Sequence, residues 1–432
     1  MTRGRAAHAA ASALALAALI VPIGGCTTRD RLNPLDPANL ETRGQIPGFA
    51  AIAGNGVVSL QWTRLTQTGV AGYVIQRWKP GEAPALLPGA VFGTGASAAA
   101  DFDVQNDSSY VYRLIARFSY GDSAFSAPDT ASPGPGYVAV LSAGAPAVYV
   151  LAPDARDIVA SIPASEAYED ADIDRDRNVL WLSDPVSGVV LRRGLFGEIA
   201  GVTLSVPGVT DVSVSNLRGV GWVASPDNGV LQAFGPDLQD PVARLSVNGL
   251  GHPRVVEAGT LDPTVWVGTD EGVVHRLQPS DGAGLEQWNL GAPIRAIALD
   301  QAARAAWVVT VRGSVNDLYR LVPGDTARAA VRVGLSNVAD VEVEEVTRTL
   351  WVSERGQPRA SAGRLTRLAS DGSVLASVTG LEPYGIAIDP GTDRAWVSDL
   401  ASNRLLLVDA AGLVRRRSPP ISVPYGVIAH LR

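Results

Sequence analysis

One unit of roughly 43 residues repeats along the chain from Tyr137 to its end. Each unit reads as a short apolar run, a turn, a run such as AWVSD, a second turn and two further apolar runs. A Trp stands at the centre of the second run in six units, and Val140 takes its place in the first, at spacings of 41, 41, 44, 41, 44 and 45 residues. The six are Trp181, Trp222, Trp266, Trp307, Trp351 and Trp396. A period of this length, made of four short strands, is typical of a β-propeller, a ring of four-stranded sheets called blades.

The first unit lacks its first strand, and the matching segment, PYGVIAHL, stands at the other end of the chain. Joining the two chain ends in one blade closes the ring and removes two exposed sheet edges. The sequence therefore predicts an all-β propeller of seven blades, closed by a split blade. First strands are expected to begin near Tyr168, Val209, Pro253, Ile294, Val338, Pro383 and Pro424.

The best-defined unit is YGIAIDPGTDRAWVSDLASNRLLLVDAAG, which begins at Tyr384. It resembles an NHL repeat, and the other six units are more divergent. The resemblance implies an NHL-like seven-bladed β-propeller over residues 134–432. Propellers of this kind commonly serve as rigid platforms for binding, which is an inference from fold and not from a site.

Residues 47–133 show short strands with alternating apolar side chains. The period of two predicts that Leu60 and Trp62 face inward, as do Tyr73 with Ile75 and Tyr110 with Tyr112 and Leu114. The stretch resembles a fibronectin type III domain, through the core Trp62, the GY start of the third strand, the DFDV segment from Asp101 and the Tyr-x-Tyr of the sixth strand. That resemblance implies a sandwich with Tyr110 at its tyrosine corner, and a spacer or partner-binding role.

The N-terminus carries a targeting pattern. Met1 to Arg5 are basic, Ala6 to Ile20 form an apolar stretch that is short for a membrane span, and IGGC ends it at Cys26. The pattern resembles a bacterial lipoprotein signal, with Ile where Leu is commonest. It implies a signal peptide over 1–25, lipidation of Cys26, and a lipidated tether over 26–46, whose composition is polar and punctuated by Pro. An ordinary secretory signal or an uncleaved anchor is the alternative.

Localisation follows from that anchor. We expect the chain in the cell envelope, held to a membrane through Cys26, and in the outer membrane if the source is Gram-negative. The composition is 46% apolar and 18% charged, as in a globular β protein, and the formal net charge is -7. Because an acidic surface repels phosphate backbones, nucleic acid is not expected as a partner.

The start of each first strand and the loop after each second strand should meet at one mouth of the ring. At the first-strand positions the chain supplies three acids, two Arg and two Tyr. These candidate ligand-binding residues are Asp170, Asp211, Asp340, Arg254, Arg295, Tyr384 and Tyr425. The acids suit a cation or a polyhydroxyl ligand, and the Arg and Tyr suit anionic or ring-shaped groups. The competing interpretation is structural, with Asp and Ser capping turns and bonding backbone N–H groups of neighbouring blades.

Three functions remain open. The first is a non-enzymatic envelope lipoprotein whose propeller binds a protein or glycan partner and needs no cofactor. The second is a metal-dependent enzyme resembling gluconolactonases or virginiamycin B lyase, with a divalent cation at the mouth; those families rely on Glu, Asn, Asp or His ligands, and no His lies among the three Asp here. The third is a purely structural envelope component. No nucleophile motif or zinc spacing supports other chemistry.

Overall fold

The computed structural model describes residues 35–37, 44–106, 108–134, 136–215, 219–260, 263–325, 329–356, 363–389 and 394–431. The predicted signal peptide, Cys26 and most of the tether lie outside these ranges. The described residues form 36 β-strands and one short 3-10 helix, Gln301–Ala303, so the chain is all-β. None of its helices within these ranges has the length and apolar character needed to cross a membrane.

Seven of the sheets that the described residues form have four antiparallel strands each. Six take consecutive strands in chain order: β12 (Ala171–Asp174), β13 (Val179–Asp184), β14 (Val189–Gly194), β15 (Leu204–Ser205); β16 (Asp211–Ser215), β17 (Val220–Ser225), β18 (Val230–Phe234), β19 (Leu245–Asn248); β20 (Pro253–Ala258), β21 (Val265–Thr269), β22 (Val273–Leu277), β23 (Gly284–Asn289); β24 (Ile294–Asp300), β25 (Ala305–Arg312), β26 (Val315–Leu321), β27 (Ala330–Ser336); β28 (Val338–Glu344), β29 (Thr349–Glu354), β30 (Gly363–Leu368), β31 (Val374–Leu381); β32 (Pro383–Asp389), β33 (Arg394–Asp399), β34 (Arg404–Val408), β35 (Val414–Arg417).

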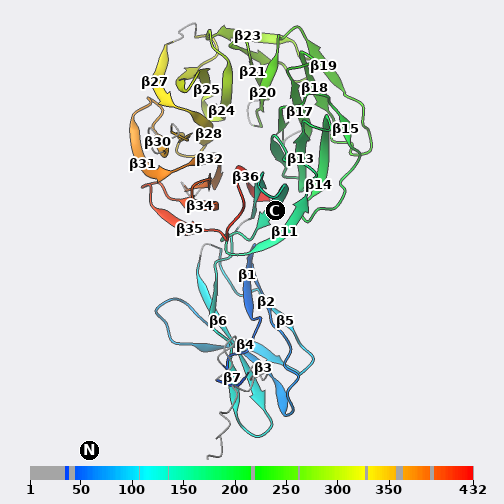
Figure 1. Ribbon diagram of the computed structural model, residues 1–432, viewed down its shortest axis with the longest axis vertical. Helices are drawn as coiled ribbons and strands as arrows, with labels where there is room; N and C mark the ends of the chain where they lie inside the picture. The colour runs from blue at the N-terminus through cyan, green and yellow to red at the C-terminus, as the bar shows by residue number, and fades with distance from the viewer. Residues whose placement is uncertain are drawn as a thin grey trace, which may run out of the picture.

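The seventh sheet combines the two ends of this region. It has the order β11 (Ile158–Pro163), β10 (Ala147–Leu151), β9 (Tyr137–Ser142) and β36 (Pro424–Leu431). First strands of successive sheets contact one another from β12 through β16, β20, β24, β28 and β32 to β36, and β36 contacts β12. The sheets are thus arranged in a circle (Figure 1), which β36 closes by pairing with β9. This all-β arrangement is compatible with a β-propeller-like fold.

The recurrent Trp side chains pack between neighbouring sheets of this circle. Each of the six is at most 2% exposed. Trp181, for example, packs against Val212 and Val223 of the following sheet. The prediction for the first unit was wrong by one residue: Ser142 pairs with Pro424 as Asp399 pairs with Pro383, which places Ala139, not Val140, at the Trp position. A period of two makes such a slip easy in an apolar run, because VAVL is buried on both faces.

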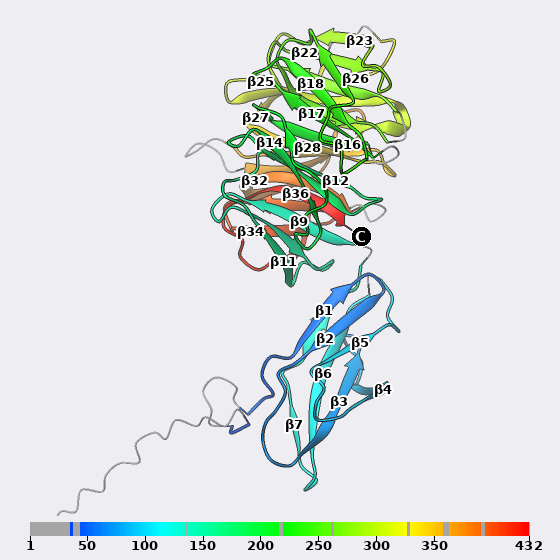
Figure 2. The ribbon, with the colours of Figure 1, turned by 90° about the vertical axis from the view of Figure 1, so that its right-hand side faces the viewer.

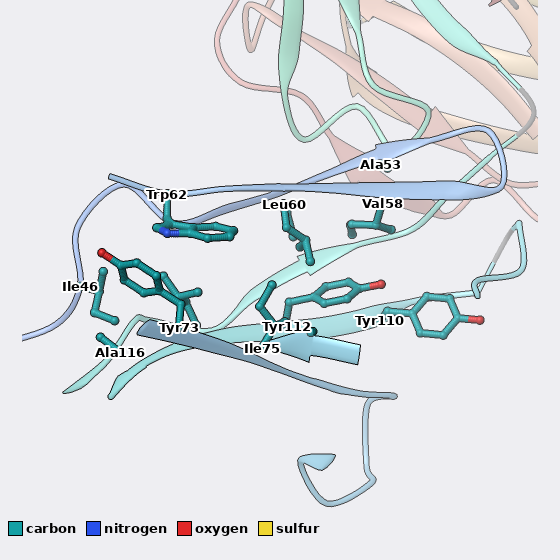
Figure 3. Close-up of a cluster of buried hydrophobic side chains, with 14 of the residues drawn as sticks. Ile46, Ala53, Val58, Leu60, Trp62, Tyr73, Ile75, Tyr110, Tyr112 and Ala116 are labelled. Carbon is teal, nitrogen blue, oxygen red and sulfur yellow. The ribbon is translucent and has the colours of Figure 1, made fainter. Parts of the chain in front are cut away.

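The N-terminal part forms two further sheets. One has the order β1 (Ala50–Gly54), β2 (Val57–Gln61), β5 (Ala98–Asp101); the other has β4 (Ala85–Phe92), β3 (Val70–Trp78), β6 (Tyr110–Phe118), β7 (Ser123–Phe125), with β8 (Asp129–Ala131) also paired to β6. The inward-facing residues predicted from the alternation are all buried, and they belong to one core cluster between the sheets (Figure 3).

Backbone contacts join this N-terminal part to the circle of sheets, end to end in Figure 2. The Ser132 N–H donates to the buried Asp154 carboxylate at 2.9 Å, and the Gly134 N–H donates to the Gly54 carbonyl at 3.1 Å. Ala152, from the loop after β10, is buried within the N-terminal core cluster. Because a buried residue of one part completes the core of the other, the connection is packed. The predicted domain limits, 47–133 and 134–432, stay predictions.

A glycine at the closing contact between β32 and β36 provides a test of the circle. A Cβ on Gly385 would lie 2.1 Å from the Tyr425 carbonyl oxygen, a backbone atom that cannot turn aside. We expect Gly385→Ala to lower the free energy of unfolding by ~1–3 kcal/mol through overpacking, measured by urea denaturation. Gly284→Ala is the matched control, since nothing lies within 4 Å of its Cβ, and it should change stability by less than about 0.5 kcal/mol. Equal effects would contradict the close approach of the two strands.

Candidate functional site

Three of the predicted residues come together where the first strands begin. The Arg295 Nη2 donates to the Tyr384 hydroxyl at 3.3 Å, and the rings of Tyr384 and Tyr425 meet edge to face with centroids 6.2 Å apart. The Tyr425 hydroxyl in turn donates to the Tyr168 carbonyl oxygen, and burial raises its pKa. Arg295 is exposed, and both Tyr rings are half-buried. We call Arg295, Tyr384 and Tyr425 the mouth cluster.

Arg254 lies at the equivalent position of its own sheet but is engaged differently. Its Nε donates to Asp270 at 2.5 Å and its Nη2 to the other carboxylate oxygen at 3.3 Å. This hydrogen-bonded pairing raises the pKa of Arg254 further above its usual range. The Arg254 carbonyl also accepts the Thr210 hydroxyl of the preceding sheet at 2.9 Å. The charge of Arg254 is therefore neutralised by this chain, in contrast to the mouth cluster.

One residue of this surface, Arg355, was not identified from the sequence. The Arg355 guanidinium lies 5.0 Å from the centroid of the Tyr384 ring, and its Nη2 is 3.2 Å from Glu382. It lies within cation–π range of the Tyr384 ring, and its pairing with Glu382 neutralises its charge within this chain, as Asp270 does for Arg254. Its place in the sequence could have identified it: Arg355 directly follows a second strand, and the loops after second strands lie at the same mouth as the starts of the first strands.

The three predicted acids bind the neighbouring sheet. Each carboxylate accepts a backbone N–H from the first strand of the sheet that follows it. The bonds are Val212 N–H to Asp170 at 3.1 Å, Val256 N–H to Asp211 at 2.6 Å and Ile386 N–H to Asp340 at 2.8 Å. These contacts are those of the structural interpretation, in which the acids bind backbone N–H groups of a neighbouring sheet.

The first strands carry a second layer of acids further along the channel, which the sequence did not single out. Asp172 accepts the Val214 N–H at 2.7 Å, in the same manner as Asp170. Burial raises the pKa of Glu257 well above its usual range, and the charges of Asp172 and Glu342 raise it further. The pKa of Glu342 rises to about 8 for the same reasons, desolvation first and the Asp340 carboxylate second.

Protonation keeps this channel from accumulating charge. Desolvation raises the pKa values of both Asp170 and Asp211. The Asp211 charge raises the pKa of Asp170 further, whereas the hydrogen bond from Asp170 lowers that of Asp211. Burial raises the pKa of Asp340 to about 6, although its backbone bonds and Arg295 act in the opposite direction. Carboxyl groups whose pKa values rise to about 7 or 8, as those of Asp211 and Glu342 do, are partly neutral near pH 7, so the channel carries less negative charge than its number of acids.

The loop acids after the second strands are also engaged locally. Asp184 accepts the Ser187 N–H at 3.0 Å, and Asp399 accepts the Ser402 N–H at 3.2 Å. Both contacts are turn capping, as the structural interpretation proposed. Among the residues that the structure describes, His, Cys, Asp and Glu form no group of three or more arranged to hold a metal ion.

Comparison with known proteins bears on the fold alone. The sequence matches no family model. No curated protein matches it either. Among solved structures, the chain is similar to hydrazine synthase from Kuenenia stuttgartiensis, with 12% identity, a TM-score of 0.50, and coverage of 59% of this chain and 86% of that chain. It is also similar to a functionally unknown protein from Desulfotomaculum acetoxidans DSM 771, with 11% identity, a TM-score of 0.54, and coverage of 68% and 98%. Identities this low show a shared fold and carry no activity to this chain.

The raised pKa values predict how stability depends on pH. The folded chain holds a proton on Glu342 up to about pH 8, whereas the unfolded chain releases it near its ordinary value of 4.5. Stability is therefore fully present below the unfolded value and is lost as the pH rises through the folded value. We expect urea denaturation to show a decline in the free energy of unfolding between pH 5 and 8.

Two variants separate Glu342 from general charge effects. Glu342→Gln cannot ionise and should make the decline shallower. Glu166→Gln, at an exposed position, should leave the profile unchanged. An unchanged slope in Glu342→Gln would show that the Glu342 carboxyl is solvated in the folded state.

Proposed function

We propose that this chain is a non-enzymatic lipoprotein of the cell envelope, whose seven-bladed, NHL-like β-propeller presents the mouth cluster to a protein or glycan partner. One observation carries the proposal: the channel acids are bonded to the backbone of this chain, while Arg295, Tyr384 and Tyr425 gather where the first strands begin. The acids therefore serve the architecture, and the groups that remain for a partner are an exposed guanidinium and two half-buried phenol rings.

The chemistry of the mouth cluster suits recognition. Tyr and Arg combine an apolar face with directional hydrogen-bond donors, which is why they are enriched among residues that dominate binding energy. A Tyr face also stacks on sugar rings, and a guanidinium pairs with the carboxylates of acidic glycans or proteins. Arg355 packs against Tyr384 and limits its motion, so less conformational entropy is lost when a partner binds.

The N-terminal part supports a spacer role in this proposal. Its two sheets on one core are compatible with a fibronectin type III-like sandwich, and the Tyr110 hydroxyl accepts the Gln105 N–H at 3.0 Å, as expected of a tyrosine corner. A lipid at Cys26, a tether over 26–46 and this sandwich would hold the mouth cluster away from the bilayer. The same proposal places the lipid anchor in the outer membrane if the source is Gram-negative.

The lipid anchor is tested by Cys26→Ser in the native host. Acylation requires the thiol, so the variant should incorporate no labelled palmitate and should leave the membrane fraction for the soluble fraction. Wild-type chain is the control, and both are followed by fluorography and immunoblotting. Membrane retention of Cys26→Ser at the wild-type level would overturn the anchor and favour an uncleaved signal segment.

The binding platform is tested by site-specific photocrosslinking in intact cells. A benzoyl-phenylalanine at Tyr384 should give one discrete adduct. The same group at the exposed position Glu169 leaves the contacts of Tyr384 intact and should give the same adduct. Val346 is the matched control: it is 74% exposed and lies in the turn between β28 and β29, at the opposite end of the first strands. Adducts from Val346 alone, or from all three sites equally, would contradict a partner at the mouth.

A further inference from the structure

A cavity of about 370 Å³ lies between two neighbouring sheets of the circle, β16–β19 and β20–β23. Pro263 and Thr264, which directly precede β21, contribute to its lining. They follow the end of the first strand β20, whereas the mouth cluster lies where first strands begin. The cavity is therefore separate from the candidate site described above, and its volume falls in the range of small-ligand sites.

The surfaces that a ligand can reach in this cavity are mainly apolar. Trp222 belongs to the lining but is fully buried, so its ring is already covered by this chain. The lining residues that keep exposed surface are Val220, Leu245, Pro263, Pro279, Arg244 and Ser280. The first four are apolar, and the other two supply one guanidinium and one hydroxyl group.

Arg244 is the charged group of this lining, to which no carboxylate of the described residues contributes. Within the described ranges the Arg244 guanidinium forms no ion pair and no hydrogen bond, and only its backbone N–H is engaged, by the Ala233 carbonyl at 2.8 Å. Arg254 of the next sheet, by contrast, pairs with Asp270. The cavity therefore presents a positive charge that no acid of the described part of the chain neutralises.

The preceding sheet shows a guanidinium that serves the fold instead. Arg192 is fully buried, and its Nη2 donates to the carbonyl oxygens of Val202 and Leu238 at 3.2 and 3.0 Å. Arg244 is exposed and stands directly before β19, next to the small residue Ala233 of β18. The fold thus uses the Arg192 guanidinium for its own carbonyls and leaves that of Arg244 for a ligand.

We propose that this cavity binds a small carboxylic acid that has an apolar body. The carboxylate pairs with the exposed Arg244 guanidinium, whose planar set of N–H donors matches the two carboxylate oxygens. The apolar body lies against the four apolar side chains named above and removes their exposed surface from water. This site goes beyond the proposed function, because it involves none of the mouth cluster and no lipid anchor.

The lining favours this ligand class over the alternatives. A cation would meet the Arg244 charge with no described carboxylate to offset it, so it is repelled. An inorganic anion would pair with Arg244 but would leave the apolar walls in contact with water. Because salt screens an exposed charge, contact with these walls contributes to affinity at physiological ionic strength, and a ligand with both features binds best.

Isothermal titration calorimetry of the full chain tests the proposal with three probes. 3-Phenylpropanoate carries both a carboxylate and an apolar body, 3-phenylpropanamide is its neutral isostere, and inorganic phosphate carries charge alone. We expect saturable binding of 3-phenylpropanoate with a Kd below about 1 mM, and binding of the other two probes at least tenfold weaker. The proposal is overturned if 3-phenylpropanoate does not bind, or if either of the other probes binds equally well.

Three variants locate the binding. Arg244→Gln removes the charge at an exposed position, so it should weaken 3-phenylpropanoate binding at least tenfold while Tm stays within about 2 °C of the wild type. Arg117→Gln is the matched control: it changes the net charge equally at an exposed position of the N-terminal part and should leave the Kd unchanged. Ala233→Leu fills part of the cavity and should abolish binding. Wild-type affinity in Arg244→Gln or in Ala233→Leu would place the ligand elsewhere and overturn the proposal.

Discussion

Side-chain oxygens that accept backbone N–H groups of the next sheet hold this circle of sheets together. First strands converge at the centre, where each exposes one row of backbone groups to its neighbour. Asp170, Asp172 and Asp211 satisfy such N–H groups, and Ser213 does the same for Ala258 at 3.0 Å. Loss of one such acceptor would leave a buried donor unsatisfied, at a cost of about 1–3 kcal/mol. The central channel is polar because the architecture needs acceptors there.

That requirement sets the electrostatics of the mouth. Several carboxylates in one narrow channel repel one another and are desolvated, and the resulting rise in their pKa values leaves them partly protonated near neutral pH. A protonated carboxyl still accepts a backbone N–H, so neutralisation does not break the contacts between sheets. Because Arg355 is paired with Glu382, Arg295 then supplies the cationic group of the mouth cluster, and under the proposed function it favours an anionic or hydroxylated partner over a metal ion.

The sequence predicted the large elements well because they depend on periodicity. Trp recurring at four-strand intervals and the alternation around Trp62 both report burial directly, and burial decides the sheets. The sequence placed Asp170, Asp211 and Asp340 correctly on the first strands but could not identify their partners. An Asp that accepts a backbone N–H and an Asp that binds a ligand can occupy the same strand position, so the sequence does not distinguish them. Val140 was assigned to the Trp position in place of Ala139, because a run that is buried on both faces has no alternation to fix its register.

Arg355 escaped detection for a different reason. It lies against the Tyr384 ring, which its own loop brings near, and a loop has no periodic pattern that predicts its conformation. Ala233 shows a related limit of the sequence: only the strand pairing places it opposite Trp222, where the sheet before it places Arg192 opposite Trp181. Both indoles are nevertheless fully buried, so other side chains of this chain cover Trp222 where Arg192 covers Trp181. Burial of the Trp is therefore the property common to these sheets, and the residue opposite it can differ because neighbouring side chains complete the packing.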